Sequence, residues 1–85
     1  PVPQTLTNVR VADRDVTAST PVREAIAETE RRLQDCGGRL VIRPSGTEPV
    51  IRIMAEGDDA EAIEALVGEL AATIRAAGGD AAANA

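Results

Sequence analysis

The sequence contains no phenylalanine, tryptophan, tyrosine, histidine or lysine. Without aromatic rings it offers no platform on which a nucleic-acid base or a sugar ring could stack. Without histidine or lysine it lacks the bases that most often activate a nucleophilic serine. The core of this 85-residue chain must therefore be built from the aliphatic side chains that dominate its 44% hydrophobic fraction.

Positive charge is also scarce. Nine arginines stand against 14 acidic residues, which gives a net charge of −5 and an isoelectric point near 4.6. This excess of acid argues against general binding to nucleic acids or anionic membranes, because both require basic surfaces. A site for an anion in such a chain must be local and must use one or two arginines. No apolar run approaches the roughly 18 residues of a membrane-spanning helix.

Cysteine occurs once, at Cys36, so the chain cannot form an internal disulfide, which fits a reducing cytoplasm. Because Cys36 ends an apolar stripe, we expect it to be a buried small hydrophobe rather than a reactive thiol. The chain begins at Pro1 instead of methionine, and we expect a piece of a longer protein. Its size predicts one small domain over residues 1–79, followed by a flexible tail over residues 80–85.

A polar turn over residues 44–49 separates two aliphatic runs, residues 39–43 and 50–55. Both runs are rich in β-branched residues, so they predict an antiparallel hairpin. If Arg43 lies opposite Val50, then Arg52 lies opposite Val41. Because side chains alternate with a period of two, this register puts both arginines on one face of the sheet.

The turn collects the donors that a phosphate requires. Ser45 and Thr47 carry hydroxyls, Gly46 lets the backbone approach a ligand closely, and Arg43 supplies a planar cationic fork. Arg52, on the strand that leaves the turn, can add a second fork. The pattern therefore predicts a phosphate-binding loop.

The remaining elements follow from periodicity and capping signals. Residues 5–11 read as a strand and residues 12–19 as a polar connection. Thr20 is expected to cap a helix over residues 21–36, which ends at two glycines. A second helix starts with capping-box spacing from Asp58 to Glu61. Its apolar stripe consists of Ile63, Leu66, Val67, Leu70 and Ile74. The predicted fold is α+β, in the order β-α-β-β-α, with two helices on one face of a small antiparallel sheet.

Four segments of the sequence also resemble a known family. The resemblance is to the C-terminal domain of the α-D-phosphohexomutases. It is carried by the loop Arg43-x-Ser-Gly-Thr-Glu-Pro49, by its continuation over residues 50–57, and by the upstream segments Pro3-Gln4 and Asn8-Val9-Arg10-Val11. Within that family the loop is most similar to the bacterial phosphoglucosamine mutase subgroup. The resemblance implies a domain like the TATA-box-binding protein, with three to four strands. It predicts the additional strand between Ala12 and Ser19.

The resemblance also implies a role. Enzymes of this family carry a phosphoserine, a Mg²⁺ ion and a sugar-reading loop on three earlier domains, and they move a phosphoryl group between two positions of a hexose. None of those motifs occurs in this sequence, so the resemblance implies no catalytic residue and no metal ligand here, with Mg²⁺ held elsewhere. The implied partners are a phosphosugar such as glucosamine phosphate and the other three domains. The implied phosphate-binding residues are Arg43, Ser45, Gly46, Thr47 and Arg52.

Simpler readings of the same residues remain open. Ser45 and Thr47 could serve only the turn, and Arg52 could pair with Glu56 or Glu48. A carboxylate is unfavourable beside a dianion, so we expect Glu48 to hold the loop through backbone amides or to orient an arginine, and a contact to a sugar hydroxyl is the less favoured alternative.

Two carboxylate pairs, Asp13 with Asp15 and Asp58 with Asp59, are more consistent with a polar link and a helix cap than with a metal site. Among functions, the alternatives are a phosphomannomutase or phosphoglucomutase domain, a non-enzymatic phosphate-binding interaction module, and a purely structural domain.

Overall fold

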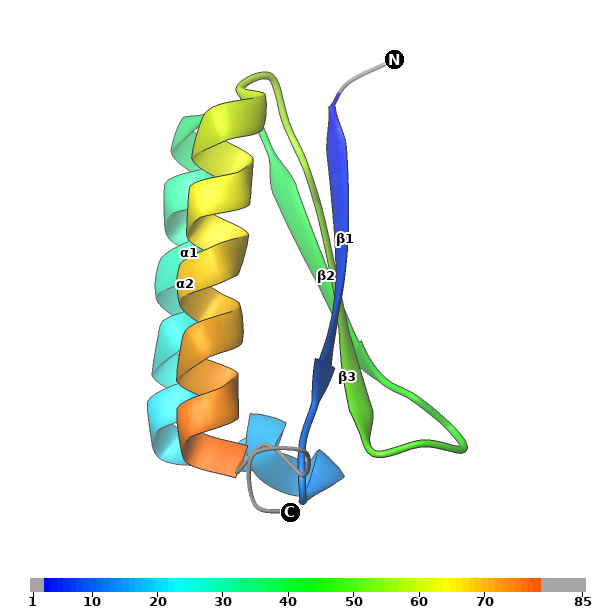
Figure 1. Cartoon of the computed structure of the whole chain (residues 1–85). Coiled ribbons are helices and arrows are strands. Elements are labelled where there is room, and N and C mark those ends of the chain that lie inside the picture. Colours follow the sequence, from blue (N-terminus) through cyan, green and yellow to red (C-terminus); the bar gives the residue numbers. More distant parts are fainter. Residues whose placement is uncertain (1–2, 79–85) are drawn as a thin grey trace.

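The computed structural model describes residues 3–78, apart from the side chain of Arg14, so the tail predicted over residues 80–85 lies outside it. The described chain forms three strands, two long helices and a short 3-10 helix (Figure 1). In chain order these are β1 (Gln4–Arg10), η1 (Arg14–Ala18), α1 (Thr20–Asp35), β2 (Arg39–Pro44), β3 (Val50–Glu56) and α2 (Ala60–Gly78).

The strands form an antiparallel sheet in the order β1-β3-β2. The predicted hairpin is confirmed as β2 and β3. Its predicted register is wrong by two residues, because Arg43 pairs with Arg52 and Pro44 with Ile51. A shift of two residues does not change which face a side chain occupies, so both arginines still share one face.

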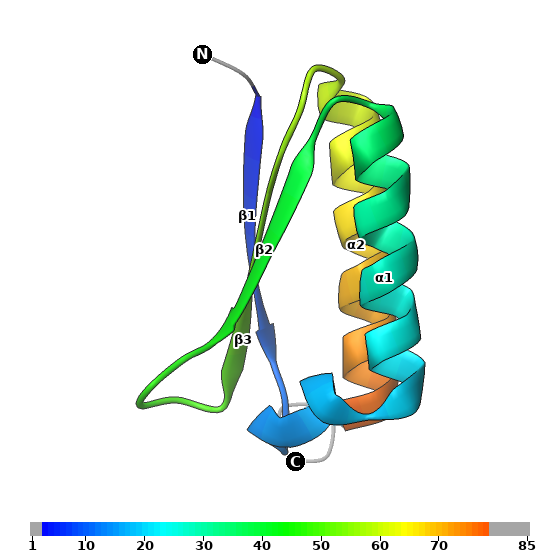
Figure 2. The ribbon, with the colours of Figure 1, turned by 180° about the vertical axis from the view of Figure 1, so that it is seen from behind.

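The two faces of the sheet differ completely. Both long helices pack on the same face, and no described element covers the other (Figures 1 and 2). Toward the helices, β1 and β3 direct Val9, Ile51, Ile53 and Ala55, all of which are fully buried. The alternate residues form what we call the outer face, which includes Leu6, a residue that is 68% exposed. The predicted α+β fold with two helices on one face is confirmed.

Helix α1 begins one residue earlier than predicted. Ser19, not Thr20, occupies the cap position, and its hydroxyl donates to the Val16 carbonyl at 2.7 Å instead of capping α1. The preceding 3-10 turn therefore takes the hydroxyl that α1 would otherwise use. Thr29 is buried on the apolar face of α1, and its hydroxyl is satisfied by the Ala25 carbonyl at 2.8 Å.

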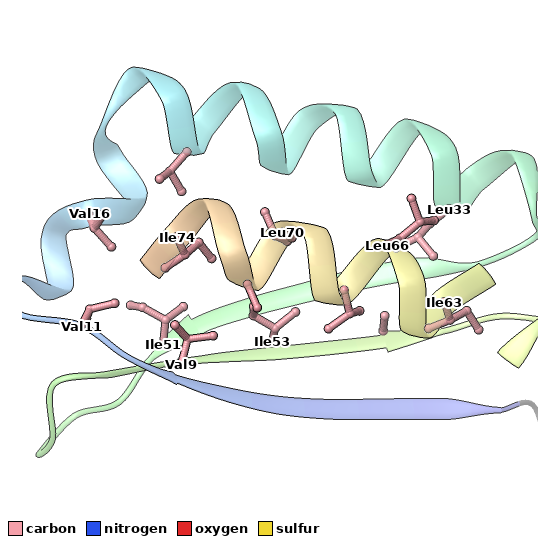
Figure 3. Close-up of a cluster of buried hydrophobic side chains, with 14 residues drawn as sticks. Val9, Val11, Val16, Leu33, Ile51, Ile53, Ile63, Leu66, Leu70 and Ile74 are labelled. Atoms are coloured by element: carbon pink, nitrogen blue, oxygen red, sulfur yellow. The ribbon is translucent and has the colours of Figure 1, made fainter. Parts of the chain in front are cut away.

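Helix α2 supplies the largest part of the core. The five stripe residues predicted from its periodicity are all buried, and they pack between α1 and the sheet (Figure 3). The cap is Asp59 rather than Asp58, because its Oδ1 accepts the Ala62 amide at 3.2 Å. None of the helices described here is long and apolar enough to cross a membrane.

The strand expected between Ala12 and Ser19 is absent from the structure, and the 3-10 helix η1 occupies its place. The Asp13 side chain accepts the Asp15 amide at 2.9 Å, and the Asp13 carbonyl accepts the Val16 amide at 3.2 Å. These local bonds favour a turn over an extended strand. The turn carries Val16 into the core, where it is only 5% exposed.

Candidate functional site

A row of three polar side chains crosses the outer face near the 45–49 loop. In the sheet register Asn8 of β1 pairs with Arg52 of β3, and Arg52 pairs with Arg43 of β2. Neighbouring strands lie about 4.8 Å apart, so the three side chains start from adjacent positions. We call Asn8, Arg52 and Arg43 the loop-end row.

The loop-end row lacks negative charge. Two arginines that face each other directly on an antiparallel pair repel, which disfavours the sheet unless an anion lies between them. Arg10, at the end of β1, is exposed on the same face and adds a third positive charge. Within residues 3–78, the side chains of the loop-end row have no hydrogen bond or ion pair to another residue.

Other arginines of this acidic chain do find carboxylates. Arg31 pairs with Glu28 along α1, and Arg32 reaches Glu69 of α2 at 3.6 Å. The pKa of the Glu28 carboxyl is lowered, mainly by its hydrogen bond from Arg31. Among the described residues Arg23 and Arg75 also have no ion pair, so the loop-end row is distinguished by the direct opposition of its two unpaired arginines across β2 and β3.

The possibility that Arg52 pairs with Glu56 is excluded by the geometry of the sheet. Glu56 lies four residues along β3, where it accepts the Gln4 side-chain amide at 3.1 Å and the Arg39 guanidinium. The hydrogen bond from Gln4, and then that from Arg39, lowers the pKa of the Glu56 carboxyl. Glu48 forms no ion pair with Arg52 either.

The loop itself is anchored at both ends. The Ser45 amide donates to the Val50 carbonyl at 2.8 Å, and the Val50 amide donates to the Glu48 carbonyl at 2.8 Å. The Val11 amide also donates to the Pro49 carbonyl at 2.9 Å, which ties the loop to the chain after β1. The loop tip projects away from the two helices, toward the side of the outer face (Figures 1 and 2).

Inside the loop, Ser45 organises the backbone. Its Oγ accepts the Thr47 amide at 3.4 Å and the Glu48 amide at 3.3 Å. The turn role considered for Ser45 is therefore present in the structure. Both distances are longer than the usual range for N–H···O hydrogen bonds, so these bonds are weak and a charged acceptor could replace them.

Gly46 has no structural reason to be glycine. A Cβ added at this position would meet nothing within 4 Å, and its φ is not in the left-handed region. Gly46, Thr47 and Glu48 are all exposed. The structure thus leaves open space where the sequence predicted close approach of a ligand to the backbone.

The carboxylate pairs considered earlier act in turns and caps. Asp13 holds the 3-10 turn and Asp59 caps α2. Among the residues that the structure describes, no three His, Cys, Asp or Glu side chains come together as metal ligands. Cys36, which we expected to be buried, lies at the end of α1 and is only half-buried.

One member of the loop-end row was not predicted as a site residue. Asn8 alternates with the buried Val9, which places it on the outer face, and this alternation is visible in the sequence. The neighbour of Asn8 is not visible there, because the pairing of β1 with β3 joins residues 44 positions apart.

Comparisons with known proteins give a consistent answer. Residues 6–73 match the family described as phosphoglucomutase/phosphomannomutase, C-terminal domain. A phosphoglucosamine mutase of Novosphingobium aromaticivorans is 56% identical over 77 residues, which cover 91% of this chain and 17% of that protein. A phosphoglucosamine mutase of Mesorhizobium japonicum is 53% identical over 74 residues, which cover 87% of this chain and 16% of that protein.

Solved structures agree. Aspergillus fumigatus N-acetylphosphoglucosamine mutase, solved in complex with GlcNAc-6P and magnesium, superposes with a TM-score of 0.75 and 26% identity over 91% of this chain and 16% of that one. The chain therefore spans about one sixth of the length of the relatives that it matches.

Proposed function

Because this chain belongs to the phosphohexomutase family, as a C-terminal domain of the phosphoglucomutase/phosphomannomutase type, we propose that it holds the substrate phosphate of a phosphoglucosamine mutase. The observation that carries the proposal is the pair of directly opposed arginines beside the 45–49 loop, without a carboxylate partner among the described residues. The parent enzyme would interconvert glucosamine 6-phosphate and glucosamine 1-phosphate in the cytoplasm.

In this proposal the phosphate lies between the loop and the outer face. Arg43 and Arg52 neutralise the dianion from the sheet side, and Thr47 and Ser45 offer hydroxyls from the loop. Gly46 permits the anion to approach the backbone. Glu48 stays outside the phosphate shell, where its carboxylate can contact a sugar hydroxyl.

The held phosphate is the one that is not being transferred. Fixing it positions the other end of the sugar for attack, which is a large part of phosphoryl-transfer catalysis. A reaction through a phosphoserine and a bisphosphorylated intermediate requires the sugar to turn round. The grip must therefore be strong enough to orient the ligand and weak enough to release it.

The chemical step belongs to other parts of the parent enzyme. The described residues provide no cluster that fits Mg²⁺, so we assign the metal to the parent's other domains and derive no step through it. We likewise assign the reacting serine to those domains. We expect no turnover from the 85-residue chain alone, and measurable mutase activity in the purified chain would contradict this division of labour.

The expected affinity is low. Four or five charge-assisted hydrogen bonds of about 1.5–3 kcal/mol each give roughly 8–12 kcal/mol, against an association cost of about 4–8 kcal/mol. The difference of about 4 kcal/mol corresponds to a dissociation constant near 1 mM. This is within the range of a titration followed by nuclear magnetic resonance.

The test is an amide NMR titration of the 85-residue chain with glucosamine 6-phosphate, inorganic phosphate and unphosphorylated glucosamine. We expect the signals of residues 43–52 to shift with both phosphorylated ligands and not with the neutral sugar. Equal shifts with neutral glucosamine, or no shift at tens of millimolar phosphate, about tenfold above the expected dissociation constant, would refute the proposal.

Two variants make the test specific. Arg43→Ala should weaken the binding of both phosphorylated ligands about tenfold or more, because it removes a charge-assisted contact. Arg23→Ala is the matched control, since Arg23 is an exposed arginine on α1 outside the outer face. Equal losses in the two variants would indicate a non-specific charge effect and would count against a site at the loop.

A further inference from the structure

Two rows of the outer face use the same three strands with nearly the same side chains. The far row contains Gln4, Glu56 and Arg39, in register across β1, β3 and β2. The loop-end row contains Asn8, Arg52 and Arg43 at the corresponding positions four residues away on each strand. Each row has a carboxamide on β1 and an arginine on β2, and the rows differ in the charge of the central residue.

The far row shows how this arrangement holds an oxyanion. The Glu56 carboxylate accepts the Gln4 carboxamide at 3.1 Å on one oxygen and the Arg39 guanidinium on the other. One oxyanion is thus held from both sides by donors on the two outer strands. The set is complete within the chain, and no external ligand is required.

The loop-end row has the donors of this arrangement without its oxyanion. Arg52 replaces the central carboxylate by a third donor, and no described acidic side chain bonds to the row. Arg10 adds positive charge at the same end of the outer face. The outer-face positions of the strands therefore carry four arginines and one glutamate, in a chain whose net charge is −5.

We propose that Asn8 is a phosphate-binding residue: its carboxamide donates to the same oxyanion that Arg43 and Arg52 hold, so the site extends over all three strands. This inference rests on the proposed function, and it adds β1 to a site otherwise built from β2, β3 and their loop. The external phosphate takes the place that the Glu56 carboxylate has in the far row. Asn8 is exposed and has no other side-chain partner among the described residues.

The geometry suits an anion larger than a carboxylate. Asn8 and Arg43 are separated by two strand spacings, about 10 Å, with Arg52 between them. The asparagine is one methylene shorter than Gln4, while the arginine side chains are long and flexible. A free phosphate is not fixed to one strand, so it can bind close to β1, within reach of the short Asn8 carboxamide. The longer side chains of Arg43 and Arg52 can extend to the same position.

The experiment uses the 85-residue chain, inorganic phosphate and glucosamine 6-phosphate at constant ionic strength. The side-chain NH₂ signals of Asn8 are followed together with the amides of residues 43–52. We expect these NH₂ signals to shift on the same binding curve as the loop amides. We expect those of Gln4 to stay unchanged, because its carboxamide already bonds to Glu56.

Substitution gives the second readout. Asn8→Ala should raise the dissociation constant for both ligands by about tenfold or more, as the loss of one hydrogen bond to a charged group does. Asn8→Asp, nearly isosteric but negatively charged, should raise it further. Gln4→Ala, on the same strand and face, is the control and should leave binding unchanged.

The outcomes separate the two proposals. Suppose that phosphate shifts the loop amides but not the Asn8 NH₂ signals, and that Asn8→Ala binds phosphate as tightly as the wild-type chain. The role of Asn8 is then refuted, while phosphate binding by the loop and the two arginines is retained. If Asn8→Ala weakens only the sugar phosphate, Asn8 reads the sugar and the present assignment is wrong. If no signal of the wild-type chain responds to phosphate, the proposed function itself fails.

Discussion

The two ends of the sheet differ in whether the polar side chains of the outer face have partners. At the far end the chain turns from α1 into β2 and from β3 into α2, and every side chain of the far row has a partner within the row. At the loop end the strands β2 and β3 meet in an exposed turn beside three guanidinium groups without carboxylates. The side chains of the far row bond to one another, whereas the arginines of the loop end are where we propose that an external anion binds.

The glycines at the two ends of the sheet also differ in how tightly the chain packs around them. A Cβ on Gly38 would lie 2.4 Å from the Glu56 carbonyl oxygen, and Gly37 has a φ of +70°, which favours glycine. A Cβ on Gly46 in the loop would meet nothing. Packing and backbone conformation thus explain these two glycines of the far end, whereas neither of them requires a glycine at position 46.

The largest effect is expected from Gly38→Ala. The new methyl group collides with backbone, not with a flexible side chain, and the Gly38 amide is held by the Leu33 carbonyl at 2.7 Å. We expect a loss of about 2–3 kcal/mol in the free energy of unfolding, measured by urea denaturation. A variant as stable as the wild type would show that this end is less rigidly packed than the structure indicates.

Arg52→Glu tests the comparison of the two rows directly. It places a carboxylate between Asn8 and Arg43, as Glu56 lies between Gln4 and Arg39. Phosphate binding should fall below detection, because the internal carboxylate competes with the ligand and repels it. Stability should rise by about 0.5 kcal/mol, since a repulsive cross-strand pair becomes an attractive one.

The measurements for Arg52→Glu are a phosphate titration and urea unfolding. Arg52→Gln, which removes the charge without supplying a carboxylate, is the matched control and should gain less stability. Undiminished phosphate binding by Arg52→Glu would show that the sheet face is not part of the site.

Gly46→Ala separates ligand binding from folding. Because a Cβ has open space here, the free energy of unfolding should stay within about 0.5 kcal/mol of the wild-type value. The dissociation constant for phosphate should rise several-fold, because the methyl group keeps the anion from the loop backbone. An unchanged dissociation constant in the NMR titration would mean that the ligand does not approach residue 46.

The smallest effect concerns acid pH at the far row. The pKa of Glu56 is lowered in the folded state by the hydrogen bonds from Gln4 and Arg39. Its contribution to stability is therefore fully present above the unfolded pKa, near 4.3, and is lost as the pH falls through the lower folded value. Glu56→Gln should flatten this part of the stability curve, measured by thermal unfolding between pH 6 and about pH 3. A curve that coincides with that of the wild type would contradict the role of these bonds.

Local patterns in the sequence were sufficient for much of this protein. The α2 stripe, the β2–β3 hairpin and the shared face of Arg43 and Arg52 all follow from periods of 3.6 and 2, which depend only on neighbouring residues. The shared face survived an error of two residues in register, because an even shift preserves the face.

Tertiary structure decided which residues become neighbours across strands and which conformation the segment before α1 adopts. Placing β1 beside β3 brings Asn8 next to Arg52, although 44 positions separate them in the chain. The segment before α1 became a 3-10 turn, because bonds around Asp13 competed with extension and Val16 reached the core. Side-chain periodicity is a property of each strand alone, whereas strand order and the neighbours across strands depend on how the whole chain buries its apolar surface. The sequence by itself therefore determined which donors the loop and strands carry, and only the fold determined that Asn8, Arg52 and Arg43 become neighbours across three strands.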